Sequence, residues 1–194
     1  MPHLRFLIPA FFLLIFLIRY YDFFFLYQPV TISFVEIQPP TLESFIVFNY
    51  FLKVLFYSFK FLFVSILVFA GIFFVDDNRD HFKEVFSIVL VSEFVFIVGD
   101  IYKIVYFTFF ATDYTEVGYM DFFPLSLYSI FPTDSNSLNY LVRSLNFFEV
   151  AYILSLIWGL HYTKCTNRPA TVVLSSYGIF LLVWISAVLL FKIE

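Results

Sequence analysis

Long apolar runs separated by short polar segments make up most of this 194-residue chain. The pattern is clearest in two neighbouring runs, residues 56–74 and 85–110, which are joined by the charged turn 76–81. Each run is long enough for an α-helix that crosses a bilayer, which takes about 20 apolar residues. Because the turn is short, the two runs should form a helical hairpin. The pattern predicts an all-α integral membrane protein.

Further apolar runs bring the predicted bundle to five transmembrane helices. Residues 4–18 resemble the core of a secretory signal peptide, but bulky and charged side chains follow where signal peptidase needs small ones, so we expect an uncleaved helix. The proline-containing segments 28–44 and 111–139 are predicted as loops, the second with a short interfacial helix over 122–131. No polar stretch is long enough to fold alone, so residues 1–194 are predicted to form one membrane domain. The expected spans are residues 4–27, 55–75, 83–110, 145–162 and 171–191.

The composition supports a membrane protein and excludes some classes of binding partner. Apolar residues make up 62% of the chain and charged residues only 13%, whereas soluble domains carry about 25% charged residues. The lipid bilayer is therefore the first expected partner. A formal net charge of -4 without a concentrated basic face argues against nucleic acid as a partner. The single cysteine, Cys165, excludes an internal disulfide.

The positions of the basic residues predict the orientation in the membrane. If five helices cross the membrane in alternate directions, five basic residues lie on one side. The loops on the other side hold Arg143 among many acidic residues. By the positive-inside rule, the amino terminus is expected in the cytoplasm and the carboxyl terminus outside. The Phe- and Ile-rich, Gly-poor composition favours a bacterial inner membrane. The basic residues placed on the cytoplasmic side are Arg5, Arg79, Lys83, Lys164 and Arg168.

Charged residues inside the predicted spans are the first candidates for function. At about 1.5 Å per residue from the cytoplasmic ends, Arg19, Lys60 and Asp100 all lie at roughly 23–26 Å, so they share a depth. An unpaired charge costs about 2.5–3.5 kcal/mol at a helix centre on insertion scales, so pairing that holds the bundle in register is favoured for this layer. The full set of intramembrane charges is Arg19, Asp22, Lys60, Glu93, Asp100, Lys103 and Glu149.

Glu93 differs from the others because it is expected near the middle of the membrane, with no basic residue at its depth. Desolvation favours the neutral form of such a carboxyl, which is the behaviour of a proton-carrying group. Glu93 and Asp100 share a helix face, and Glu149 adds a carboxylate on the next predicted helix. These three residues predict either a path for protons or cations, or hydrogen bonds that join helices.

Small residues recur every four positions on the fourth predicted helix, at Ala151, Ser155 and Gly159. Such a stripe lets another helix approach closely. It predicts a packing surface, whose neighbour is either another helix of this chain or a second protein.

Motifs for chemistry are missing from the sequence. It contains no glycine-rich nucleotide loop and no GxSxG, HExxH or CxxC motif, so no enzyme activity, catalytic residue or cofactor is predicted. The acidic residues of the segment 76–84, with His161 and Cys165, match no familiar set of metal ligands. Asp80 or Asn78 is better placed as a helix N-cap, and no metal site is predicted.

The carboxyl-terminal part carries a recognisable order of features. Residues 123–127 (FPLSL) precede a polar loop, and residues 145–149 (LNFFE) open a helix that ends in Gly159 and Leu160. A short basic turn and a final helix with Trp184 follow. From residue 122 onward the chain thus resembles the second half of the Yip1-type membrane domain. The resemblance implies five spans, a cytoplasmic amino terminus and a small scaffold, which in eukaryotic members binds small GTPases; it implies no catalytic residues.

We therefore expect a non-enzymatic inner-membrane protein that binds other membrane protein subunits. It would act as an accessory or assembly subunit of a larger complex, or as a Yip1-like scaffold. The alternative is a small proton- or cation-coupled transporter or channel that uses Glu93 and Asp100, with Glu149 as a possible third site.

Overall fold

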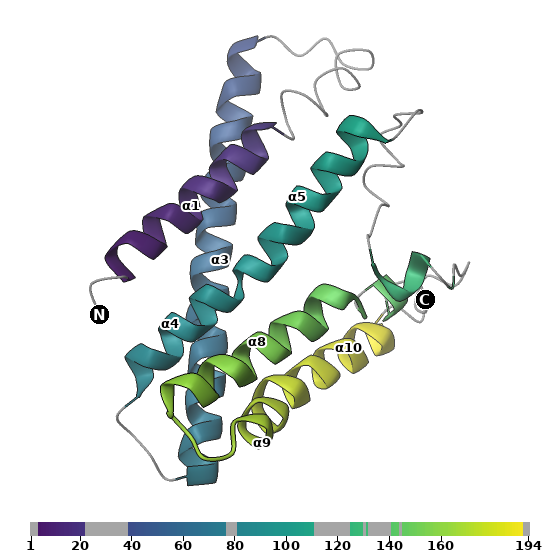
Figure 1. The fold of residues 1–194 in the computed structure, drawn as a ribbon. Coiled ribbons are helices and arrows are strands. Elements are labelled where there is room, and N and C mark those ends of the chain that lie inside the picture. The colour runs from purple at the N-terminus through teal and green to yellow at the C-terminus, as the bar shows by residue number, and fades with distance from the viewer. Residues whose placement is uncertain are drawn as a thin grey trace. The chain divides into compact units, whose positions relative to one another are not determined.

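The computed structural model is helical almost throughout the residues that it describes (Figure 1). No β-strand occurs in these residues, and Ser126 and Asn146 form an isolated antiparallel bridge. Three helices are long and apolar enough to cross a membrane, namely Tyr50–Asp76, Phe82–Phe109 and Pro169–Leu190. The structure describes residues 4–21, 39–76, 81–110, 125–129, 131, 141–143 and 145–191.

Each predicted span overlaps a helix of the structure, and residues 22–27 of the first span lie outside the described residues. Residues 83–110 are divided between α4 and α5 by a break at Glu93, and residues 171–191 run through α9, a π-helix and α10. The bounds are α1 Leu4–Tyr21, α3 Pro39–Asp76, α4 Phe82–Ser92, α5 Phe94–Phe109, η2 Leu127–Ser129, α8 Phe147–Thr163, α9 Pro169–Val173, η3 Leu174–Gly178 and α10 Ile179–Phe191.

One predicted loop differs in part from the structure, and the other can be compared only at its few described residues. The helix α3 already begins at Pro39, inside the segment 28–44 that was expected to be a loop. Proline is tolerated in a first helical turn, because the N–H groups there have no acceptor within the helix. Within residues 122–131, where a short helix was predicted, Leu127–Ser129 form the 3-10 helix η2. Residues 122–124 and 130 lie outside the described residues.

The chain divides into two compact units that are interleaved along the sequence. Unit 1 comprises Met1–Lys60 and Ile97–Phe122, and unit 2 comprises Phe61–Phe96 and Phe123–Glu194. The helices α3 and α5 therefore each contribute to both units.

Unit 1 packs α1 against the first half of α3. The buried side chains of α1 recur every three to four residues, at Phe11, Ile15 and Ile18, and so form one face of the helix. The Tyr50 hydroxyl of α3 donates to the Phe12 carbonyl at 3.3 Å, and its ring lies 5.0 Å from that of Phe16. These contacts place the apolar face of α1 on α3.

Unit 2 contains the main hydrophobic core. Its central helix is α8, which packs against both α4 and α9 (Figure 1). The buried face of α8 repeats every four residues, at Tyr152, Leu156 and Leu160. The core residues are Val64, Val68, Ile72, Val85, Ile88, Val89, Tyr152, Leu156, Leu160, Cys165, Val172, Val173 and Tyr177.

Asp76, the last residue of α3, joins that helix to the turn between α8 and α9. Its Oδ2 atom accepts hydrogen bonds from the Thr166 hydroxyl and, at 3.0 Å, from the Asn167 N–H group. The Arg168 N–H group in turn donates to the Thr166 hydroxyl at 3.0 Å. The end of α3 and this turn therefore lie at the same end of unit 2.

Replacing Asp76 with Ala is expected to lower the stability of the protein in detergent by about 1–3 kcal/mol, because both donors lose their acceptor. Thermal melting by circular dichroism measures the change. Glu84→Ala is the control: this acid is also near the end of a helix, but its contact with His81 is long, at 3.9 Å, so its removal should cost less than about 0.5 kcal/mol. Equal melting temperatures for the two variants would contradict a role for Asp76 as a tether.

Cys165 lies in the same turn, where its thiol is buried 3.0 Å from the Thr163 hydroxyl. Burial raises the pKa of this thiol, although the hydrogen bond to Thr163 lowers it in part. The thiolate is the reactive form, and it is scarce at neutral pH when the pKa is raised. We expect N-ethylmaleimide at neutral pH to label Cys165 only after denaturation. Rapid labelling of the native protein, followed by mass spectrometry, would show that the thiol is accessible.

Candidate functional site

Glu93 occupies the break between α4 and α5, and its side chain is 0% exposed. Its N–H group still donates to Val89 in the helical pattern, at 3.0 Å, but its carbonyl accepts from Phe96 only three residues on, at 3.1 Å. The backbone thus tightens locally to a 3-10 turn at Glu93. The break places a carboxyl group inside unit 2, between two apolar helices.

The second carboxyl group of the site, that of Glu149, lies at the start of α8. The Asn146 side chain caps this helix by accepting from the Glu149 N–H group at 2.8 Å. Glu149 therefore lies in the first turn, where a negative charge is favourable. Tyr152, one turn further, is fully buried and lies on the same helix face.

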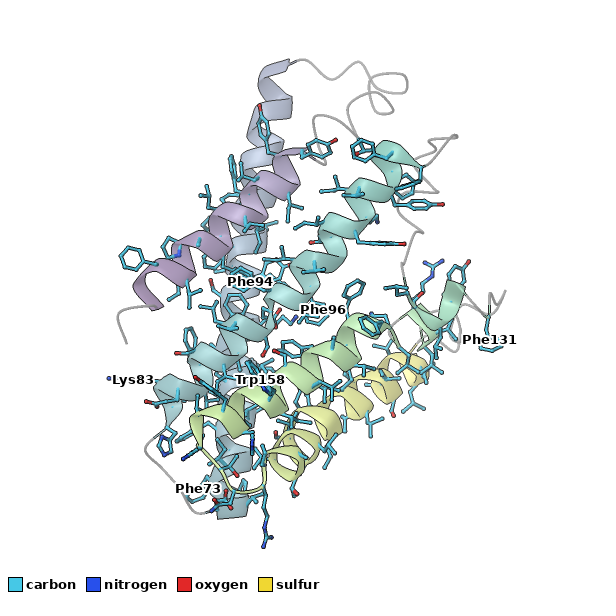
Figure 2. The ribbon with its side chains drawn as sticks, viewed as in Figure 1. Phe73, Lys83, Phe94, Phe96, Phe131 and Trp158 are labelled. Atoms are coloured by element: carbon cyan, nitrogen blue, oxygen red, sulfur yellow. The ribbon has the colours of Figure 1, made fainter. Side chains whose placement is uncertain are left out.

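Tyr177 completes the site from the π-helix η3. Its hydroxyl donates to Glu149 Oε2 at 3.1 Å, and its ring lies 5.2 Å from that of Tyr152. Phe96 is labelled in Figure 2. The centre of its ring lies 5.1 Å from that of the Tyr152 ring, so it forms part of the apolar surroundings of the site. Tyr177 was not among the residues that the sequence singled out.

We call Glu93, Glu149, Tyr152 and Tyr177 the carboxyl–tyrosine cluster. The ionisable groups that act on the Tyr152 hydroxyl are Glu93, Tyr177 and Glu149, and those that act on the Tyr177 hydroxyl are Glu149 and Glu93. Among the described residues, these neighbouring groups are two carboxyls and a phenol, and no basic side chain is among them. The carboxyl and hydroxyl groups of such a cluster can bind and release protons.

The remaining intramembrane charges that the sequence singled out belong to unit 1. Lys60, Asp100 and Lys103 lie there and are half-buried. The Arg19 side chain and Asp22 lie outside the described residues. Of the predicted intramembrane charges, Glu93 and Glu149 belong to unit 2 and to the carboxyl–tyrosine cluster.

The small-residue stripe of α8 packs inside unit 2, against α4. The Ser155 hydroxyl lies 3.0 Å from the Ser92 hydroxyl of α4. A Cβ atom added at Gly159 would lie 2.5 Å from Cγ2 of Ile88, so only glycine fits this contact. Ala151 is half-buried on the same helix. The neighbour left open by the sequence is therefore a helix of this chain, and Ser155 and Gly159 offer no docking surface to a second protein.

No metal-binding group is found among the residues that the structure describes, since no three His, Cys, Asp or Glu side chains there gather closely enough. Asp76 is occupied by its two hydrogen bonds to the α8–α9 turn. Asp77 and Asp80 lie outside the described residues.

Comparison with known proteins leaves the site to be interpreted from its own geometry. The chain matches no protein-family model, and no similar curated protein or solved structure was found. The Yip1 resemblance therefore rests on the residues quoted for it above.

Proposed function

We propose that this chain is a multi-pass bacterial inner-membrane protein that carries protons, or cations in their place, through the carboxyl–tyrosine cluster. In this proposal five helices cross the bilayer, and the amino terminus lies in the cytoplasm. The end of unit 2 that holds Asp76 then faces the cytoplasm as well. The observation that carries the proposal is Glu93, which is fully buried at a break in a membrane-length helix.

The physical argument is the cost of charge away from water. Burying a charged carboxylate away from water costs several kcal/mol. Glu93 is fully buried and Glu149 is half-buried. A proton bound to Glu93 therefore removes the costlier charge, and the Tyr177 hydroxyl stabilises Glu149 through its hydrogen bond. Carboxyl groups that face the interior of a membrane bundle are typical of proton relays. Their supply of oxygen ligands is also compatible with a small cation.

Purified protein in proteoliposomes provides the test. We expect a pH gradient to drive proton flux, read by a pH-sensitive dye trapped inside the vesicles, and Glu93→Gln to reduce it to the level of protein-free vesicles. Glu84→Gln on the same helix is the matched control and should leave the flux unchanged. Sodium and potassium gradients in the same vesicles distinguish a cation from a proton. Wild-type flux in Glu93→Gln would exclude Glu93 as the carrier.

A second candidate function is the accessory subunit or Yip1-like scaffold. The observation in its favour is the outward face of α8, where large exposed side chains recur every three to four residues, at Phe147, Val150, Leu154 and Trp158. The rings of Trp158 and Tyr162 stack at 5.7 Å. In a bilayer this face contacts either lipid or a helix of another protein.

Gentle extraction of the native, tagged protein followed by mass spectrometry tests this second candidate. If α8 binds a partner, larger membrane subunits should accompany the protein in fixed ratio. Trp158→Ala should then release them, because an aromatic anchor is lost from the contact. Leu13→Ala, an exposed position on α1, is the control. Recovery of the protein alone would favour the proton-carrying function.

A further inference from the structure

The helices α4 and α8 pack side by side in opposite directions. The Ser92 hydroxyl of α4 lies 3.0 Å from the Ser155 hydroxyl of α8. Four residues earlier on α4, Ile88 meets Gly159, which lies four residues later on α8. A residue nearer the start of α4 thus pairs with one nearer the end of α8. The start of α4 and the end of α8 therefore lie together, at the end of unit 2 that holds Asp76.

A lysine lies at each of these two helix ends. Lys83 is in the first turn of α4, and Lys164 is the C-cap of α8. Continuing the same pairing for five residues, about 7.5 Å along the helices, brings the two backbone positions together. The electrostatic effect of Glu84 on the Cys165 thiol agrees with a close approach here. Both lysine side chains are exposed, and Figure 2 shows Lys83 at the outer edge of α4.

The turn after α8 adds a third basic side chain to this end of unit 2. Arg168, the N-cap of α9, lies four residues after Lys164 and is exposed. The acids that the structure describes here are half-buried and have partners: Asp76 accepts hydrogen bonds from the turn, and Glu84 lies 3.9 Å from His81. The exposed charges of this described part are therefore mainly positive. We call Lys83, Lys164 and Arg168 the basic patch.

Two aromatic side chains next to the basic patch mark the level of the membrane surface. Trp158 and Tyr162 lie in the last turns of α8, are 68% and 76% exposed, and stack at 5.7 Å. Trp and Tyr are enriched where helices pass from the lipid tails to the headgroups. Tyr162 precedes Lys164 by only about 3 Å along the helix axis, and the headgroup layer is about 5–7 Å thick on each side of a bilayer. With the two rings at the edge of the tails, the basic patch lies among the headgroups.

We propose that the basic patch binds the phosphate of an anionic phospholipid, whose glycerol and upper acyl chains pack on the Trp158–Tyr162 pair. Ammonium and guanidinium groups form charge-assisted hydrogen bonds with phosphate. A zwitterionic lipid brings a positive group to the same place, which the basic patch repels, so the site favours phosphatidylglycerol over phosphatidylcholine. The inference requires that the chain crosses the membrane, but it does not depend on the proton-carrying function.

Native mass spectrometry of the full chain in a mild detergent tests the site. Phosphatidylglycerol and phosphatidylcholine are titrated separately, and the bound lipids are counted. We expect the wild type to bind phosphatidylglycerol more tightly. Each cation near an anionic lipid surface contributes about a fivefold gain in affinity. Lys164→Gln should therefore weaken phosphatidylglycerol binding about fivefold, and the double variant Lys164→Gln/Arg168→Gln about 25-fold.

Arg143→Gln is the matched control, because it also removes one cation, but from the segment before α8, where the guanidinium lies 4.6 Å from the centre of the Tyr128 ring. It should bind phosphatidylglycerol as tightly as the wild type. Equal wild-type affinities for the two lipids would overturn the inference, and so would equal phosphatidylglycerol binding by Lys164→Gln and Arg143→Gln. A protein subunit bound in place of the lipid, and lost from the double variant, would also overturn it.

Thermal melting separates lipid binding from a structural role of the same charges. A cation at a helix C-terminus also stabilises the helix itself, and that effect is present without lipid. We expect added phosphatidylglycerol to raise the melting temperature of the wild type and of Arg143→Gln, and to raise that of the double variant much less. High salt should reduce the wild-type gain, because exposed charges are screened. An equal gain in the wild type and the double variant would show that the basic patch binds no lipid.

Discussion

The Glu93→Gln protein is expected to melt at a higher temperature than the wild type in detergent, although it carries no flux. Glutamine has nearly the same shape and keeps hydrogen-bonding atoms, but it cannot hold a charge in the buried position of Glu93. Residues kept for function often lower the stability of the fold, and replacing them typically gains about 0.5–2 kcal/mol. The expected gain separates a functional carboxyl from one that only joins helices.

Thermal melting of Glu93→Gln and of the surface variant Glu84→Gln in the same detergent measures this effect. The control should melt within the error of the wild type, since Glu84 is only partly buried. If Glu93→Gln instead lost about 1–3 kcal/mol, the carboxyl would be a structural hydrogen-bonding group on which the fold depends. That result would weigh against proton transport even before a flux is measured.

Gly159→Ala is expected to destabilise the protein relative to Gly178→Ala. Both substitutions improve helix propensity by a similar amount, so the difference between them reports the local contact. A Cβ atom at Gly159 meets Ile88 at 2.5 Å, whereas one at Gly178 has its nearest neighbour at an ordinary 3.7 Å. Overpacking of this kind costs about 1–3 kcal/mol. The contact lies in the middle of the α4–α8 interface.

A double-mutant cycle with Ile88→Ala checks the cause. Shortening Ile88 removes the atom that the new methyl group would meet, so the double variant should lose less stability than the two single variants added together. Strict additivity, or equal melting of Gly159→Ala and Gly178→Ala, would show that the helices do not approach as closely as the structure has them. The outcome is independent of what the protein transports or binds.

Most of the fold could be predicted from the sequence, because apolar runs of membrane length locate helices directly. The helix α3 ends at Asp76 and α4 begins at Phe82, close to the ends that hydropathy predicted. The start of α3 was predicted too late, since prolines were interpreted as loop residues although a first helical turn accepts them. The membrane crossings of α1 and α8 stay predictions, since α8 has 17 residues and α1 has 18 with Pro9 inside.

The site could be predicted only in part, for a physical reason. Glu93 and Glu149 can be recognised in the sequence, because a carboxyl group anywhere in an apolar run costs free energy when that run enters the membrane. Tyr177 does not stand out, because tyrosine is common in this chain and its hydrogen bond to Glu149 joins separate helices. No local pattern encodes it.

The interleaving of the two units has a consequence for how the protein is made. Unit 1 ends at Phe122, so the ribosome has synthesised all of it while the larger part of unit 2, Phe123–Glu194, is still to be made. The second half of α3, with Val68 and Ile72, belongs to the same core as Val172 and Val173 near the other end of the chain. Until those residues emerge, lipid or an insertase has to shelter that half-helix. The carboxyl–tyrosine cluster, which includes Tyr177, is thus among the last parts of the protein to form during synthesis.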